Sequence, residues 1–236
     1  MVNVEIKTYK LNYAAEEAYK SLRTNIQFCG EDKKVVAVTS CTPNEGKSSV
    51  TLNLAVSMSE AGKKVLLIDA DLRKSVMVGR IKVSGSVKGL AHYLSKQSSM
   101  IDVICSTNVR NLHIVFAGPV PPNPAELLGS KYFKEMVTSL RKVYDYILID
   151  TPPLGSVIDS AIIAEECDGS IMVIESGVIS YRFAQDVKAQ LEKSNCPILG
   201  VVLNKIDMSG NGYYGKYYGK YYGKYYGKYH EELKEG

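Results

Sequence analysis

Six short runs of almost continuous apolar residues recur along the chain, most of them separated by segments of helical spacing. The runs lie at residues 35–39, 65–68, 112–116, 146–149, 170–174 and 198–203. Such runs are typical of strands in a sheet that is covered on both faces, because a half-solvated strand alternates apolar with polar residues. Alternation with helices further indicates that the sheet is mostly parallel. The sequence therefore predicts the α/β class, with a doubly wound sheet.

Helical and irregular segments complete this outline. Apolar spacing predicts helices over residues 13–28 and 47–60, and a third helix from about residue 125. Residues 75–89, which are rich in Gly, Ser, Val and Lys, predict a mobile loop near a ligand site. Four prolines between residues 119 and 124 predict an extended path.

A tyrosine-rich repeat lies near the end of the sequence. Tyr-Tyr-Gly-Lys occurs four times, and nine of the 17 tyrosines lie in residues 213–236. The period of four and the glycine in every unit favour neither an amphipathic helix nor an alternating strand, so we expect the hydroxyls to be exposed. The repeat is a candidate substrate or an adhesive extension, and composition does not decide between them. The candidate acceptors are Tyr213, Tyr214, Tyr217, Tyr218, Tyr221, Tyr222, Tyr225, Tyr226 and Tyr229.

Composition argues against several other classes of protein. The net charge of +4 is weak and its basic residues are scattered outside the repeat, so a concentrated nucleic-acid surface is not expected. The amino-terminal segment has no apolar signal-peptide core, and no run approaches the roughly 18 apolar residues that span a bilayer. Five cysteines without a CxxC pair argue against a disulfide framework or a zinc site. We expect a soluble, cytoplasmic protein.

A candidate phosphate loop, SCTPNEGKSS, lies between the first predicted apolar strand and the helix that follows it. Strand, glycine-containing loop and helix form the setting in which backbone amides cradle phosphate groups. Lys47 is placed to reach the β- and γ-phosphates and Ser48 to bind Mg²⁺, whereas Cys41 replaces the usual first glycine. The candidate nucleotide contacts in this loop are Pro43, Asn44, Glu45, Gly46, Lys47, Ser48 and Ser49.

Carboxylates follow two of the other predicted strands. Asp69 and Asp71 come after one apolar run and Asp150 after another, at the strand ends where ligands bind in open α/β sheets. Carboxylates gathered there would repel one another and a phosphate unless a cation were bound. We therefore expect Asp150 and Asp69 to support a magnesium ion together with Ser48. Asp69 is also the candidate that orients or deprotonates an attacking hydroxyl, and Asp71 and Arg73 support the metal and the phosphates.

These motifs together resemble those of the bacterial tyrosine kinases of the capsule and exopolysaccharide type. In that family the loop around Lys47, the pair Asp69 and Asp71, and Asp150 before Thr-Pro-Pro correspond to the Walker A, A′ and B motifs. The resemblance spans residues 13–229 and includes the stretch PPNPAELL. It implies a P-loop nucleoside triphosphatase fold with Lys47, Asp69, Asp71 and Asp150 as catalytic residues, and ATP and Mg²⁺ as cofactors.

The resemblance also implies a biological setting. An enzyme of this family phosphorylates its own tyrosine cluster, between neighbouring subunits of a ring, and controls polysaccharide synthesis or export. A transmembrane adaptor activates it and recruits it to the inner face of the cell membrane, and a cognate tyrosine phosphatase acts on it. On this interpretation residues 1–33 form a helical segment with a ring contact, residues 34–208 the kinase domain, and residues 209–236 a disordered, flexible tail.

The expected ring contact is carried by Glu17, Lys20 and Arg23. Their spacing is similar to the family's Glu-x-x-Arg-x-x-Arg motif, with lysine at the middle position. Residues three apart share one face of a helix, so the three charges can meet a neighbouring subunit or can simply be solvated. Lysine lacks the planar fork of arginine, which changes the contact that this position can make.

Two other functions stay open at this point. A partition or division-site ATPase shares the loop type but has a lysine early in the loop, where this chain has Thr42. A GTPase would explain Asn204-Lys-Ile-Asp207, which matches the guanine-reading pattern, but Asp150-Thr-Pro-Pro replaces the Asp-x-x-Gly motif of that class. In the resembling ATPases an asparagine after this strand lies near adenine, so Asn204 is a candidate contact for the base.

Overall fold

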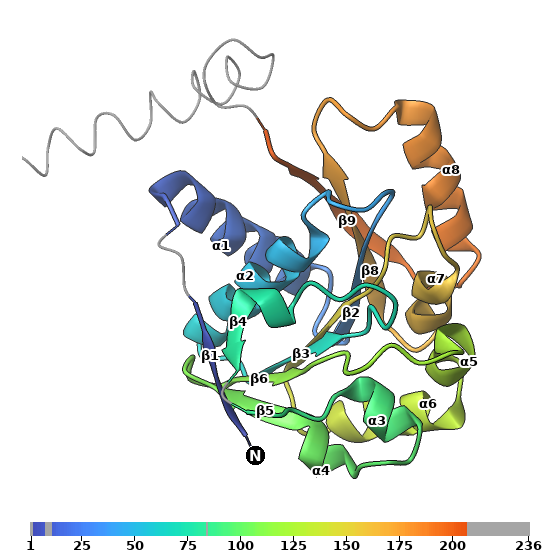
Figure 1. Ribbon diagram of the computed structural model, residues 1–236. Coiled ribbons are helices and arrows are strands. Elements are labelled where there is room, and N and C mark those ends of the chain that lie inside the picture. The colour runs from blue at the N-terminus through green and yellow to red at the C-terminus, as the bar shows by residue number, and fades with distance from the viewer. Residues whose placement is uncertain (1, 8–10, 84, 207–236) are drawn as a thin grey trace, which may run out of the picture.

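The structure is a computed structural model, and it describes residues 2–7, 11–83 and 85–206 (Figure 1). The candidate acceptor tyrosines, the predicted tail 209–236 and Asp207 all lie outside the described residues. Within the described residues no helix is both long enough and apolar enough to span a membrane.

One sheet of nine strands organises the described residues, in the order β4-β1-β5-β6-β3-β7-β2-β8-β9. The strands are β1 (Asn3–Ile6), β2 (Val35–Ser40), β3 (Val65–Asp69), β4 (Ile81–Val83), β5 (Ile104–Thr107), β6 (Leu112–Val115), β7 (Tyr146–Asp150), β8 (Gly169–Glu175) and β9 (Ile198–Asn204). The six strands from β6 to β9 in this order are parallel to one another. β5 is antiparallel to β6, β1 is parallel to β5, and β4 is antiparallel to β1. The predicted, mostly parallel sheet is confirmed.

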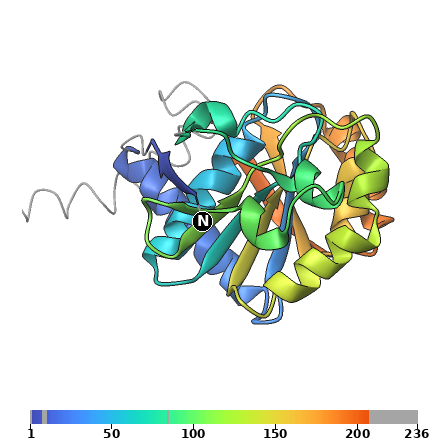
Figure 2. The same ribbon diagram turned by 60° about the horizontal axis from the view of Figure 1, so that its bottom comes forward.

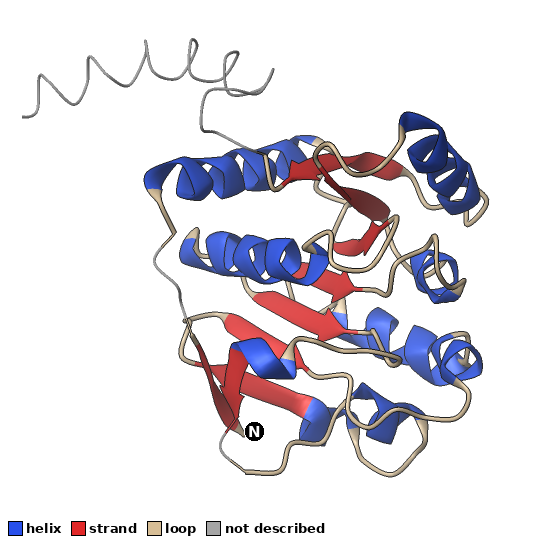
Figure 3. Ribbon diagram, turned by 45° about the horizontal axis from the view of Figure 1, so that its top comes forward, coloured by secondary structure: helices blue, strands red, loops and turns tan. Residues whose placement is uncertain are grey.

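Helices cover both faces of this sheet, as Figure 3 shows. They are α1 (Tyr13–Phe28), α2 (Lys47–Glu60), η1 (Val78–Arg80), α3 (Leu90–Leu94), α4 (Met100–Val103), α5 (Pro124–Leu128), α6 (Lys131–Leu140), α7 (Asp159–Ala164) and α8 (Tyr181–Glu192). α1 and α2 lie on one face, and α3, α5, α6 and α7 pack on the other, an arrangement also visible from below in Figure 2. The chain is therefore doubly wound.

The central strand β7 illustrates how the sequence produces this layering. Its residues are all buried, and successive side chains point to opposite faces. Tyr146 and Leu148 join the cluster that contains α2, whereas Ile147 and Ile149 join the cluster that contains α6. Burying both faces favours apolar residues at successive positions, which is why residues 146–149 show no alternation with polar residues.

The short elements at one side of the sheet differ from the expectation. Residues 78–83, predicted as part of a mobile loop, form η1 and β4, and β4 pairs with β1. That part of the prediction was wrong because three or four residues of mixed polarity carry no period, and their strand structure depends on pairing with neighbours. β1 lies within the predicted segment 1–33 and belongs to the same sheet as the rest of the chain.

Candidate nucleotide and phosphate site

The phosphate loop joins β2 to α2, as the sequence predicts. β2 ends at Ser40, and α2 begins at Lys47. Gly46 precedes the helix with a φ of 90°, in the left-handed region that favours glycine. A Cβ at this position would lie 2.2 Å from Asn204 Nδ2, so there is no room for a side chain. Because the loop follows the last residue of β2, its amides and the helix N-terminus lie at the carboxyl end of the sheet. Phosphate groups bind at this end in folds of this kind.

Lys47 lies among the predicted carboxylates. Its Nζ is 3.6 Å from Asp71 Oδ2 and 3.6 Å from Asp150 Oδ1, and it donates to Ser48 Oγ at 3.3 Å. Asp69 and Asp150 are register partners across β3 and β7. The four predicted catalytic residues thus come together, and their exposed fractions are only 8% for Lys47, 6% for Asp71, 1% for Asp150 and 0% for Asp69.

Burial and mutual repulsion change the acidity of two of these carboxyls. Burial, followed by the charge of Asp150, raises the pKa of Asp69 to about 7. Burial also raises the pKa of Asp150, although the charge of Lys47 and a hydrogen bond from Ser48 oppose it. Ser75 Oγ donates a hydrogen bond to Asp69 and partly offsets the rise there. A carboxyl with a pKa near neutrality is suited to take up a proton from a bound hydroxyl at physiological pH.

The donor set fits a divalent cation that is bound together with phosphate groups. The Lys47 ammonium faces the carboxylates of Asp71 and Asp150, and Asp69 lies opposite Asp150 in the sheet, so the cluster has more carboxyl groups than cations. Among the residues that the structure describes, no three Asp, Glu, His or Cys side chains are placed to hold a metal ion by themselves. Magnesium usually takes one or two protein oxygens and completes its shell with substrate phosphates and water. Ser48, Asp69 and Asp150 are compatible with that mode of binding.

Asp71 and Arg73 are held by contacts outside the phosphate loop. Asp71 Oδ1 accepts hydrogen bonds from the backbone amides of Arg73 at 3.3 Å and Lys74 at 2.9 Å. The Arg73 guanidinium donates two hydrogen bonds, at 2.8 and 2.9 Å, to Asp159, the buried first residue of α7. The predicted phosphate-supporting arginine is thus anchored by an ion pair that joins the segment after β3 to the first residue of α7.

Glu45 braces the phosphate loop from within. Its carboxylate accepts hydrogen bonds from the Thr42 amide, from Thr42 Oγ1 at 3.1 Å and from the Glu175 amide of β8 at 2.9 Å. Only 1% of Glu45 is exposed. Because these donors occupy the side chain, the backbone of Glu45 is the part that can face a phosphate.

The other predicted loop residues lie at different depths. Pro43 and Asn44 are exposed, and Asn44 has a φ of 70°. Ser49 is half-buried and lines a groove of about 740 Å³ between α1 and α2. Asn204, predicted to contact the base, donates from Nδ2 to the Glu45 carbonyl at 2.9 Å. The structure therefore brings Asn204 to the loop itself.

The predicted ring-contact residues are engaged within the chain. Lys20 pairs with Glu17 on α1 at 2.7 Å. Arg23 Nη1 donates to the Ser57 carbonyl at 2.8 Å and to Ser57 Oγ at 3.2 Å, which ties α1 to α2. Glu17 and Lys20 keep partly exposed side chains, so they are the members of the motif most open to a neighbouring molecule.

Sequence reasoning missed several side chains that support the site. Thr51 Oγ1 donates to the Lys47 carbonyl at 2.8 Å and lies 3.5 Å from Asp150 Oδ1, and Ser75 donates to Asp69. Glu175 ends β8 at the same edge of the sheet as Asp150, so the rule that selected the other carboxylates also applied to it. Thr51 and Ser75 carried no signal, because a lone hydroxyl in a helix or a loop has many other uses.

The sequence and the fold of this chain are similar to those of known proteins. A family model described as "AAA domain" matches residues 33–194. The tyrosine-protein kinase CpsD of Streptococcus agalactiae is 46% identical over 223 residues, which cover 92% of this chain and 97% of that protein. The kinase domain of the Escherichia coli tyrosine kinase ETK superposes with a TM-score of 0.78 and 28% identity, over 84% of this chain and 79% of that one. The septum site-determining protein MinD of Pyrococcus horikoshii, solved with Mg-ADP, gives a TM-score of 0.62 and 28% identity, over 75% and 72%.

Proposed function

Because the chain belongs to the family of bacterial tyrosine-protein kinases, we propose that it transfers the γ-phosphoryl group of ATP to tyrosines of its own carboxyl-terminal repeat. The observation that carries this proposal is the position of Lys47, 3.6 Å from both Asp71 and Asp150 at the end of a phosphate loop. Phosphoryl transfer requires little covalent chemistry from the protein, so catalysis depends on positioning and on compensation of charge.

Each residue of the cluster has a role in this proposal. The loop amides and Lys47 hold the β- and γ-phosphates. Asn204 supports the loop through its hydrogen bond to the Glu45 carbonyl. Ser48 and Asp150, with support from Asp69, would hold Mg²⁺, which when bound would neutralise part of the negative charge of the phosphates. Asp69, with its pKa raised to about 7, orients the phenol and takes up its proton. Asp71 fixes Lys47, and Arg73, paired with Asp159, supports the phosphates.

The wider setting is part of the same proposal. We take residues 1–33 as the segment with the ring contact, 34–208 as the kinase domain and 209–236 as the acceptor segment. Transfer runs between subunits of a ring, with Glu17, Lys20 and Arg23 at the contact. A transmembrane adaptor activates the kinase and recruits it from the cytoplasm to the inner face of the membrane, where it regulates capsule or exopolysaccharide synthesis or export. A cognate tyrosine phosphatase reverses the modification, and nucleic acid has no part.

A division-site ATPase is the main alternative and is less well supported. MinD resembles the fold less closely than the kinase domain of ETK does, and Thr42 stands where that class of ATPase has its early lysine. For the GTPase alternative, Asn204 is already committed to the Glu45 carbonyl. Competition between ATP and GTP for the site separates the GTPase from the kinase.

Incubation with Mg²⁺ and ATP tests the proposal directly. The full chain is incubated with and without a candidate adaptor fragment that is known to bind, and the tail is analysed by mass spectrometry. We expect phosphate on several tyrosines of residues 213–229 in the wild type. The Lys47→Met variant should give none, because the phosphates lose their clamp. Absence of phosphate from the wild type under both conditions would refute the kinase.

A further inference from the structure

Lys205 connects the end of β9 to the phosphate loop. It follows the strand directly, with a φ of 56°, and its Nζ donates to the Asn44 carbonyl at 2.7 Å. The same ammonium pairs with Glu175 Oε2, at the end of β8, at 2.8 Å. One side chain thus holds a loop carbonyl and a strand-end carboxylate at once.

The neighbouring contacts form one network with Lys205. Asn204 Nδ2 donates to the Glu45 carbonyl at 2.9 Å, and the Glu175 amide donates to the Glu45 carboxylate at 2.9 Å. Two consecutive loop carbonyls, those of Asn44 and Glu45, are therefore bound by consecutive side chains of one strand end. Carbonyls that are tied back in this way leave the loop amides free to face a phosphate.

The loop conformation needs such support. Asn44 has a φ of 70°, in a region that L-residues other than glycine adopt at a cost in conformational energy. Asn44 is also exposed, so packing around its side chain does not hold it there. The hydrogen bond from Lys205 acts on the carbonyl of this residue.

We propose that Lys205 is a positioning residue of the nucleotide site, which presets the phosphate loop by binding the Asn44 carbonyl and Glu175. The inference rests on the proposed function to the extent that the loop binds a nucleotide. The ion pair itself is partly exposed to solvent, with side-chain exposures of 46% for Lys205 and 24% for Glu175, so solvent screening limits its contribution to folding stability. Its effect is on the geometry of the loop and hence on affinity for the nucleotide.

Titration calorimetry of the full chain with Mg·ADP tests the inference. Lys205→Met should weaken binding about tenfold, which corresponds to about 1.4 kcal/mol. The unfolding free energy without nucleotide should stay within about 0.5 kcal/mol of the wild type, as for most surface substitutions. Phosphorylation at saturating ATP should fall less than twofold. Lys205→Arg should retain most of the affinity, since its guanidinium can still donate to both acceptors.

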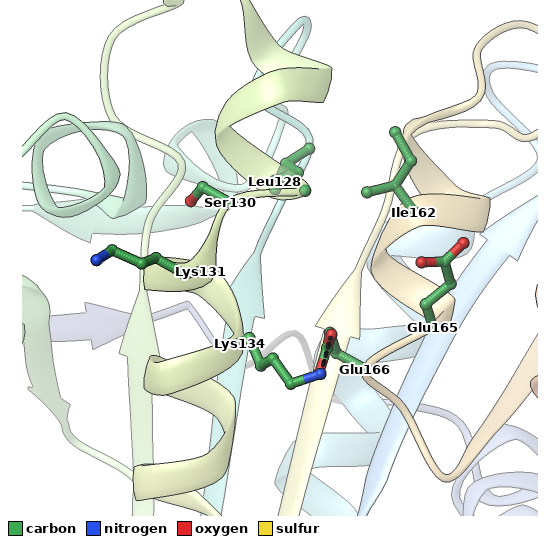
Figure 4. Close-up of a pocket in the computed structure, with 8 residues that line it drawn as sticks. Leu128, Ser130, Lys131, Lys134, Ile162, Glu165 and Glu166 are labelled. Carbon is green, nitrogen blue, oxygen red and sulfur yellow. Dashed lines mark hydrogen bonds and ion pairs between the residues drawn. The ribbon is translucent and has the colours of Figure 1, made fainter.

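A second ion pair provides a matched control. Lys134 of α6 pairs with Glu166 at 3.2 Å, with side-chain exposures of 68% and 25% (Figure 4). It lies on the face of the sheet opposite to α2, because α6 packs in the other core cluster. Lys134→Met should leave the Mg·ADP affinity unchanged.

The outcomes are distinct. An affinity of Lys205→Met equal to that of the wild type overturns the inference, and so does a loss of affinity that is matched by a loss of folding stability and not restored by Lys205→Arg. A wild type that binds no Mg·ADP refutes nucleotide binding and the inference with it. A wild type that binds Mg·ADP but phosphorylates no tyrosine refutes the kinase alone, and the comparison of affinities still tests Lys205.

Discussion

Replacing Asp69 with asparagine should stabilise the nucleotide-free protein, and increasingly so as the pH rises. Asp69 is fully buried, and burial together with the Asp150 charge raises its pKa from 3.8 to about 7. Below pH 3.8 the carboxyl is protonated in both the folded and the unfolded state and has no effect. Between 3.8 and about 7 the unfolded state ionises first, so folding stability falls, and above 7 the loss is complete.

The size of the effect follows from the linkage of ionisation and folding. Each pH unit between the two pKa values corresponds to about 1.36 kcal/mol. The easier ionisation of Asp69 in the unfolded state therefore lowers the unfolding free energy by about 2 kcal/mol at pH 5.5 and by about 4 kcal/mol at pH 8. An amide of the same shape can still accept the hydrogen bond from the Asp71 backbone on its one oxygen, and its NH2 group can donate to the Ser75 hydroxyl, which rotates to accept. It also removes one neighbouring charge from Asp150, which acts in the same direction.

Urea unfolding at pH 5.5 and pH 8, without nucleotide or magnesium, measures these values. Asp186→Asn, at an exposed position on α8, is the control and should change the unfolding free energy little at either pH. Phosphorylation of the tail by Asp69→Asn should fall by a factor on the order of 100, as for loss of a general base. A variant that is more stable but less active would agree with a carboxylate that is retained for chemistry.

Two results would refute the reasoning. A variant no more stable than the wild type at pH 8 would mean that the folded protein already compensates the Asp69 charge without ligand. A gain that is equal at pH 5.5 and pH 8 would mean that packing, and not ionisation, is responsible.

Three further substitutions or treatments test other contacts. Gly46→Ala should abolish nucleotide binding in calorimetry and lower the unfolding free energy by about 1 to 3 kcal/mol, because its Cβ would lie 2.2 Å from Asn204 Nδ2 at a φ of 90°. Asp159→Asn should lower the unfolding free energy in urea by about 1 to 2 kcal/mol, since it removes the charge from a buried carboxylate that accepts two hydrogen bonds from the partly exposed Arg73, and an unchanged value would contradict that role. At pH 8 iodoacetamide should modify exposed Cys29 well before Cys196, whose pKa burial raises to about 11. Peptide mapping measures both rates, and equal rates would be inconsistent with this.

The sheet and its catalytic edge were predictable because their signals are local. Strands such as β3 and β7 are apolar at every position before the last, and each ends in a carboxylate at its own carboxyl end. Parallel strands then bring those ends to one edge, where Lys47 begins α2. No knowledge of tertiary contacts was needed to expect Asp69 and Asp150 beside Lys47.

Contacts between distant segments were not predictable in the same way. Arg73 and Asp159 are 86 residues apart, and nothing in either local sequence indicates the pair. Asn204 had a plausible use at the base, yet its amide binds a loop carbonyl, because the end of β9 lies against the phosphate loop. Such pairs depend on the relative placement of whole elements, which periodicity does not encode.

The place of β1 in the sheet affects how the protein can be dissected. In the strand order, β1 lies between β4 and β5 and is the strand through which β4 joins the sheet. Deleting residues 1–6 would therefore remove the pairing partner of two strands and leave the edge of β5 open to other chains. An expression fragment that starts at α1 is expected to self-associate for that reason. A fusion partner attached directly to Asn3 would be joined to a strand that has a neighbour on each side, β4 and β5.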